Sequence, residues 1–177
     1  MAKPVAPREQ LSAGETFFAA HGLDVQHFAA IWHIFKIAQL METDLNELSK
    51  RHGMSIADFH LLSALMMQSP EPMRATDLAY ALNVTNAALS VRIHKLAKQG
   101  LLALSISMTD RRAKLLVLSS EGREKVISVG RDLEKNGRFA RNFKNLSQHD
   151  RENLGRITAD IHTRLARDFA PAPRKDC

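Results

Sequence analysis

Apolar residues along most of this chain recur at intervals of three and four, which is the period of an amphipathic helix that buries one face. The pattern predicts helices over residues 25–51, between Ser55 and Ser69, and over residues 76–82, 86–99, 121–142 and 148–169. The first and last of these carry the longest apolar stripes. Their members are Phe28, Ile31, Trp32, Phe35, Ala38, Leu45 and Leu48 in the first, and Leu154, Ile157, Ile161, Leu165 and Phe169 in the last.

The period changes after Gly100. Apolar and small or polar residues alternate over residues 102–106 and again over 116–118, which favours two strands. The link between them, residues 107–113, is polar and basic, so the pair is expected to form a β-hairpin with a basic tip. A short helix, a turn capped by Thr85, a second helix and this hairpin follow one another. We therefore predict a mainly α fold with a small β-hairpin wing, a winged helix-turn-helix.

The composition indicates the class of protein. The chain has 177 residues, of which 45% are hydrophobic and 25% charged, as in a globular protein of one domain with an added oligomerisation arm. Cys177 is the single cysteine, which excludes an internal disulfide or a cysteine-based zinc site and suits the cytoplasm. No apolar run has the length of a membrane helix. We expect residues 1–10 and 170–177 to be loose.

Positive charge is concentrated in one stretch. The formal net charge is +6, and between Val84 and Lys114 the single acid is Asp110. The basic residues there are Arg92, Lys95, Lys98, Arg111, Arg112 and Lys114. Such a footprint favours contact with nucleic-acid phosphates over an ordinary solvated face, in which acids and bases interleave.

The helix over residues 86–99 is the expected recognition helix. Leu89, Ile93 and Leu96 share one face and should point into the core. The residues left for the major groove and the DNA backbone are Thr85, Asn86, Ala88, Ser90, Arg92 and Lys95. We expect Lys95 and Lys98 to meet phosphate. In the wing, Arg111 and Arg112 suit an electronegative minor groove, and Asp110 is placed to hold a guanidinium.

Residues 54–122 resemble the MarR family of regulators. The likeness rests on ATDLA at 75–79, ALSVRIHKL at 88–96, GLL at 100–102, and DRRAKLLVL at 110–118 followed by Glu121 and Gly122. It implies a homodimeric winged-helix repressor or activator whose DNA and effector binding are linked. It also implies that Arg112 enters the minor groove beside Asp110, and that Asn86, Ala87, Ser90 and Val91 face the major groove. Relatives often carry a polar or basic residue at the position of Val91.

The resemblance divides the chain into functional segments. Residues 1–22 form an N-terminal extension that is partly loose, 23–53 and 120–169 are dimerisation helices, 54–119 form the DNA-binding domain, and 170–177 form a loose tail. The two long stripes exceed what a small winged helix can cover, so a twofold dimer is expected to bury them. The alternative is that both stripes pack within the monomer.

An effector pocket is implied between the dimer helices and the DNA-binding domain. Its candidate residues are Trp32, His33, Phe35, Phe59, His60, Met66 and Arg92. The stretches 23–25 and 90–93 resemble the urate-responsive branch, but His60 stands where that branch has an acid. A planar aromatic acid is the expected effector, held by His60, His33 or Arg92.

Other functions remain as alternatives. No phosphate loop, nucleophile elbow or paired metal motif suggests an enzyme, and no cofactor is expected. The eight histidines leave a metal sensor open, although no His-x-x-x-His pair occurs. A winged-helix protein-interaction module is the other rival. The preferred hypothesis is a cytoplasmic, dimeric regulator of double-stranded DNA, a repressor released from a pseudo-palindromic operator by an aromatic effector.

Overall fold

The computed structural model describes residues 6–68, 70–106 and 114–169. In these ranges the chain is mainly helical with a small antiparallel sheet, as predicted. The helices are α1 (Pro7–Ala20), α2 (Phe28–Arg51), α3 (Ile56–Gln68), α4 (Ala75–Ala81), α5 (Asn86–Lys98), α6 (Ser120–Asn136), α7 (Arg138–Lys144) and α8 (Gln148–Asp168). The strands are β1 (Met73–Arg74), β2 (Leu102–Ile106) and β3 (Lys114–Leu118). None of the described helices is both long and apolar enough to cross a membrane.

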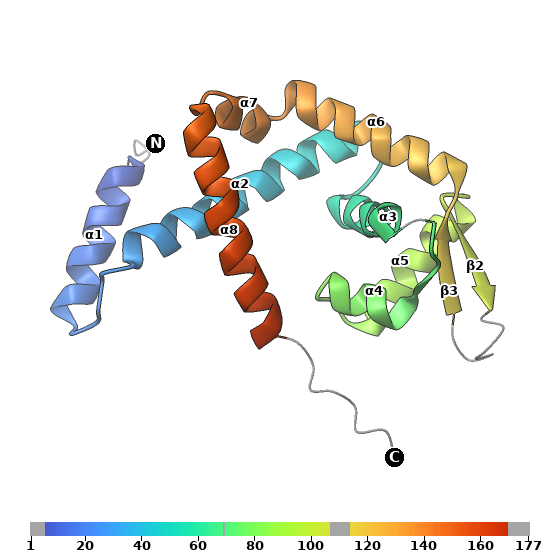
Figure 1. Ribbon diagram of the computed structural model, residues 1–177, viewed down its shortest axis with the longest axis horizontal. Helices are drawn as coiled ribbons and strands as arrows, with labels where there is room; N and C mark the ends of the chain where they lie inside the picture. Colours follow the sequence, from blue (N-terminus) through green and yellow to red (C-terminus); the bar gives the residue numbers. More distant parts are fainter. Residues whose placement is uncertain (1–5, 69, 107–113, 170–177) are drawn as a thin grey trace, which may run out of the picture.

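The helices α3, α4 and α5 and the sheet form a winged-helix unit, on the right of Figure 1. The strand order is β1-β3-β2, and Leu116 of β3 pairs with Leu104 on one side and Met73 on the other. The two-residue β1 was not predicted, because so short a strand has no period to detect. The core of the unit consists of Met54, Leu61, Leu62, Leu65, Leu78, Ala79, Leu89, Ile93, Leu96, Leu102, Leu116 and Val126.

Local capping fixes the ends of the recognition helix. The Thr85 hydroxyl accepts a hydrogen bond of 3.2 Å from the Ala88 amide, as an N-cap does. Gly100, just past the end of the helix, has φ of +73°, a conformation that favours glycine. The Thr85 cap was expected from the sequence.

The N-terminal segment differs from the expectation. Pro7–Gln10 lie in α1, not in a loose tail, and the Ala6 amide donates to the Glu9 carboxylate at 3.3 Å. Proline suits a first helical turn, where its missing amide hydrogen costs nothing. The helix packs on α2 through Phe18 and Phe28, whose ring centroids lie 5.2 Å apart. Gly14 allows this approach, since a Cβ there would lie 2.9 Å from the Phe28 ring.

The single helix predicted over residues 121–142 is also wrong. Gly137 is extended, with φ of −63° and ψ of 129°, and separates α6 from α7. The carboxylate of Asp44 on α2 accepts a 3.1 Å hydrogen bond from the Phe139 amide, and Arg138 pairs with Glu47 at 2.8 Å. These contacts with α2 stabilise the new direction of the chain.

A second polar contact joins α2 to α6. His52, just past α2, donates through Nε2 to the Asp132 carboxylate at 3.0 Å, and its Nδ1 accepts from the Ser128 hydroxyl at 3.4 Å. The carboxylate of Asp132 also accepts from Asn136 at 2.5 Å. The long helix α2 is thereby tied to the winged-helix unit through α6.

The α8 stripe and part of the α2 stripe stay exposed within this one chain, whereas Leu48 of the α2 stripe is buried. No residue of α8 is buried, and its stripe residues together with Phe169 are 40% to 77% exposed. On α2, the residues Ile31, Ile34, Phe35, Ile37 and Leu40 are exposed as well. The alternative in which both stripes pack inside the monomer is therefore wrong for this fold.

Candidate nucleic-acid interface

Helix α5 buries one face and leaves the other open. Leu89 and Leu96 are 1% exposed and Ile93 is 4% exposed, because they pack into the winged-helix core. The hairpin strand β2 packs beside α5, as Figure 1 shows. The predicted DNA-facing residues that remain exposed are Thr85, Asn86, Ala87, Ala88, Ser90 and Lys95. Arg92 is half-buried, and Val91 is exposed as well. An exposed helix beside a hairpin has the shape that a major groove admits.

The two cations in the middle of α5 are not free. Lys95 Nζ lies 2.6 Å from Oδ2 of Asp58, and an Arg92 guanidinium nitrogen lies 3.6 Å from Oδ1 of the same carboxylate. Asp58 belongs to the first turn of α3, and its side chain is only 2% exposed. Its amide donates to the Ser55 hydroxyl at 3.1 Å, as in one half of a capping box. Arg92 and Lys95 therefore join the recognition helix to α3.

The charge state of Asp58 follows from these contacts. Burial alone would raise the pKa of its carboxyl, because the charged form loses hydration. Hydrogen bonds from Lys95 and Ser55 and the positive charges of Lys95 and Arg92 outweigh burial and hold the pKa below its ordinary value of 3.8. Asp58 is thus ionised at neutral pH and attracts both cations. Any phosphate that binds Lys95 has to compete with this carboxylate.

The predicted wing residues belong to a segment that the structure does not describe. Asp110, Arg111 and Arg112 fall outside the described residues, so their contact with DNA stays a prediction. Among the predicted phosphate contacts, Lys98 lies in the last turn of α5 and is exposed.

The predicted effector residues do not form one pocket within a single chain. Trp32, His33 and Phe35 lie on the N-terminal half of α2, where the last two are exposed. At 1.5 Å of rise per residue, Trp32 lies roughly 28 Å along α2 from Arg51. Arg51 is the last residue of α2, and α3 follows it in the chain. On α3, Phe59 and Met66 pack against the winged-helix core and His60 is exposed. Arg92 is paired with Asp58, as described above.

A groove beside these helices is lined by other residues. A groove of about 430 Å³ lies between α2, α7 and α8. It is largely apolar, with Asp44 and Arg138 at its edge. Its lining residues are Ile37, Leu40, Met41, Thr43, Asp44, Arg138, Phe139, Asn142, Phe143, Leu146 and Leu154. The sequence pattern shows these helices to be amphipathic but does not reveal that they enclose a groove.

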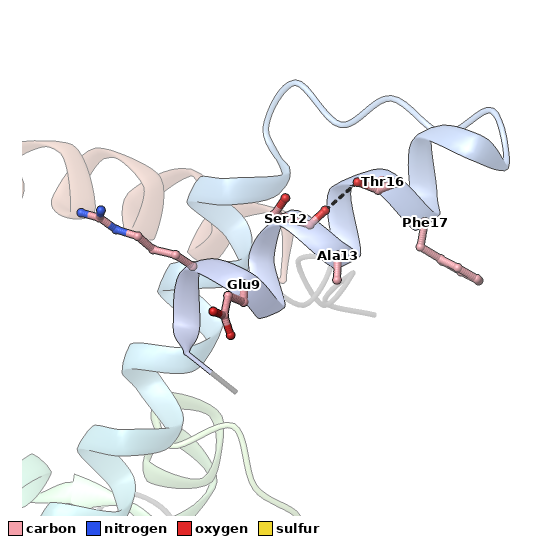
Figure 2. A pocket seen from close by; sticks show the side chains of 6 residues that line it. Glu9, Ser12, Ala13, Thr16 and Phe17 are labelled. Carbon is pink, nitrogen blue, oxygen red and sulfur yellow. Dashed lines mark hydrogen bonds between the residues drawn. The ribbon is translucent and has the colours of Figure 1, made fainter. Parts of the chain in front are cut away.

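A second hollow follows one side of α1. It is lined by Arg8, Glu9, Ser12, Ala13, Thr16 and Phe17. Figure 2 shows these side chains along a single helix, with the Thr16 hydroxyl donating to the Ser12 carbonyl at 2.8 Å. A surface of one helix lacks the opposing wall of an enclosed site. The described residues also contain no group of three or more His, Cys, Asp or Glu side chains that could hold a metal ion.

Comparisons with known proteins agree with this geometry. Residues 52–113 match the model of the MarR family. A sequence comparison with curated proteins gives no match. Among solved structures, wild-type MarR from E. coli in its apo form is 20% identical, with a TM-score of 0.63 over 72% of this chain and 92% of that one. AbsC, a MarR family regulator from Streptomyces coelicolor, is 19% identical, with a TM-score of 0.65 over 93% of this chain and 98% of that one.

A third similar structure includes DNA. The transcriptional repressor CouR bound to a 23-mer DNA duplex is 22% identical, with a TM-score of 0.64 over 79% of this chain and 98% of that one. These likenesses show the fold, and the family model identifies the segment that contains α3 to β2 and the link to β3. Residues 52–113 are therefore similar to the MarR family, and the described part of the chain has the fold of MarR-family regulators.

Proposed function

We propose that this chain is a MarR-family transcriptional regulator, a homodimer that represses transcription from a pseudo-palindromic operator and is released by an aromatic acid. The observation that carries the dimer is the exposure of two long apolar stripes, on α2 and α8, in a single chain. Stripes of this extent on a monomer would favour aggregation, whereas a twofold axis would bury both. We expect such a regulator to act in the cytoplasm, where its DNA lies.

The groove between α2, α7 and α8 supports the same arrangement. Its walls include Leu40 on α2 and Leu154 on α8, which are both exposed. Apolar side chains from a second copy of the chain would fill it and remove these residues from water. A stable interface buries about 1,200–2,000 Å² in total, which two paired 20-residue helices can supply.

The dimer would present two copies of α5 to one face of a duplex. Half-sites read by such pairs lie about one helical turn apart, roughly 34 Å. Asn86 and Ser90 would contribute base contacts, and Lys98 with Arg111 and Arg112 would meet the backbone or minor groove. The concentrated positive charge predicts an affinity that falls steeply with salt.

The effector proposal depends on Arg92. An aromatic carboxylate that bound Arg92 would compete with Asp58 and loosen the contact between α3 and α5. Trp32, His33 and Phe35 would lie far from such a ligand in the same chain, so we assign them a role only where the dimer brings another element beside them. Phe59, His60 and Met66 on α3 are nearer to Arg92 in the fold.

Two measurements test the proposal. Ile161→Glu places a charge in the α8 stripe and is expected to yield monomers in sedimentation equilibrium, whereas Thr163→Glu, on the opposite side of the helix, should leave the dimer intact. In a mobility-shift assay with the promoter region of its own gene, the dimer should bind and Arg112→Ala should weaken binding to many sequences. A protein-interaction module without DNA binding would shift none of the duplexes, even at low salt.

A further inference from the structure

Helix α5 exposes apolar side chains at the end expected to enter DNA. We call Val84, Ala87, Ala88 and Val91 the apolar patch. Val91 is 72% exposed and Val84 is 41% exposed, and both alanines are exposed too. Because residues three and four apart are neighbours on a helix, the two alanines lie one turn before Val91 on its side of α5.

The segment that forms the patch contains polar residues but no charged ones. Asn86 and Ser90 lie within the same two turns, and no charged residue occurs from Val84 to Val91. The next cations along the helix, Arg92 and Lys95, are held by Asp58. The first two turns of α5 therefore offer no free guanidinium or ammonium for the paired acceptors of guanine, the usual partner of such groups.

The major groove contains one apolar group that matches this surface. The C5-methyl of thymine projects there and makes apolar contacts with small side chains, whereas the other base edges present donors and acceptors. A protein partner is the competing occupant of an exposed apolar patch. The patch is small, however, and it lies at the start of α5, around the N-cap Thr85. This helix also begins the most basic stretch of the chain, which favours a polyanion as the occupant.

We propose that Val91, with Ala87 and Ala88 beside it, reads thymine methyl groups, so that each half-site of the operator places thymines under the first two turns of α5. The proposal rests on the proposed function, since it requires operator binding by α5. It adds the chemistry by which the operator is chosen. Asn86 would then act on neighbouring adenines, whose N6 and N7 suit an amide.

The test separates the methyl group from the rest of the base. A duplex selected by the purified protein from a randomised library is resynthesised with deoxyuridine in place of thymine, which removes only the methyl. Each contacted methyl should then cost about four-fold in affinity, the effect of burying one such group. Val91→Ala should weaken binding to the thymine duplex and lose the response to deoxyuridine at the same positions.

Met67→Ala is the matched control. Met67 is 85% exposed and lies on α3, so its loss should change neither the affinity nor the response to deoxyuridine. The inference is overturned if the selected half-site has no thymine, if deoxyuridine changes the affinity by less than about two-fold, or if Val91→Ala keeps the full response. Selection of no duplex at all would overturn the proposed function, and this inference with it.

Discussion

Lys95→Met removes one cation from the Asp58 carboxylate while keeping an unbranched apolar stem of similar length. In the native protein the Lys95 ammonium lies 2.6 Å from Asp58, and the remaining partner, Arg92, is farther away at 3.6 Å. The substitution therefore leaves a buried, ionised carboxylate with one weaker cationic partner. We expect a loss of folding stability that an exposed lysine on the same helix would not produce.

The magnitude follows from the burial of each partner. Breaking a fully buried ion pair by removing one member costs about 3–5 kcal/mol. Here Asp58 is 2% exposed but Lys95 is 51% exposed, so the lost interaction is partly screened by water. Arg92 also remains near the carboxylate. We therefore expect about 1–3 kcal/mol, the cost of leaving one buried acceptor poorly satisfied.

The effect should depend on pH with a definite sign. The folded-state pKa of Asp58 lies below its ordinary value of 3.8. Its ion pairs therefore contribute stability that is complete above that value and is lost as the pH falls through the lower folded-state pKa. Without Lys95 the folded-state pKa rises, because burial is less well opposed. The difference between the two proteins should shrink as the solution becomes acid enough to protonate Asp58 in both.

Urea unfolding followed by circular dichroism measures this effect from neutral to acid pH. All proteins are compared at one protomer concentration, since association stabilises the folded state. Lys98→Met, in the last turn of α5, is the matched control and should stay within about 0.5 kcal/mol of the native protein. Equal stabilities and parallel pH profiles for the two methionine variants would refute the assigned role of Asp58.

Two further predictions concern the packing of α6. A Cβ at Gly122 would collide with the Leu101 carbonyl oxygen, so Gly122→Ala should lower stability by about 2–3 kcal/mol in thermal unfolding. Gly130 has no atom within 4 Å of such a Cβ, so Gly130→Ala should raise stability by about 0.5–1 kcal/mol; the opposite order would contradict the packing. Hydrogen bonds from Asn136 and His52 lower the pKa of Asp132, so Asp132→Asn should lower the melting temperature at neutral pH, and the difference should vanish once acid protonates the carboxyl. A difference that persisted at low pH would argue against this role.

The winged-helix unit could be predicted from the sequence because its signals are local. Thr85 caps α5 through an amide three residues on, and Gly100 lies two residues past the end of the helix. The alternation that marks β2 and β3 lies within each strand. Such features do not depend on distant parts of the chain. The same local character explains why the exposed and buried faces of α5 were assigned correctly.

The features that could not be predicted depend on distant partners. The break at Gly137 is stabilised by Asp44 on α2, whose carboxylate accepts a hydrogen bond from the Phe139 amide. These two residues are 95 positions apart in the sequence. The pairing of Lys95 with Asp58 joins residues 37 positions apart. A basic residue on an exposed helix looks the same in sequence whether it is free or paired, so Lys95 was expected to meet phosphate.

The pairing of α5 with α3 bears on the operator choice that we propose for α5. A helix with free cations would bind many duplexes through their phosphates, since that contact carries no sequence information. With Arg92 and Lys95 held by Asp58, the first two turns of α5 contribute amide, hydroxyl and apolar groups, which act on base edges at short range. The same carboxylate lies in the first turn of α3, so any ligand that moves α3 also releases or redirects these two cations. Operator choice and its control would thus depend on one buried side chain, Asp58.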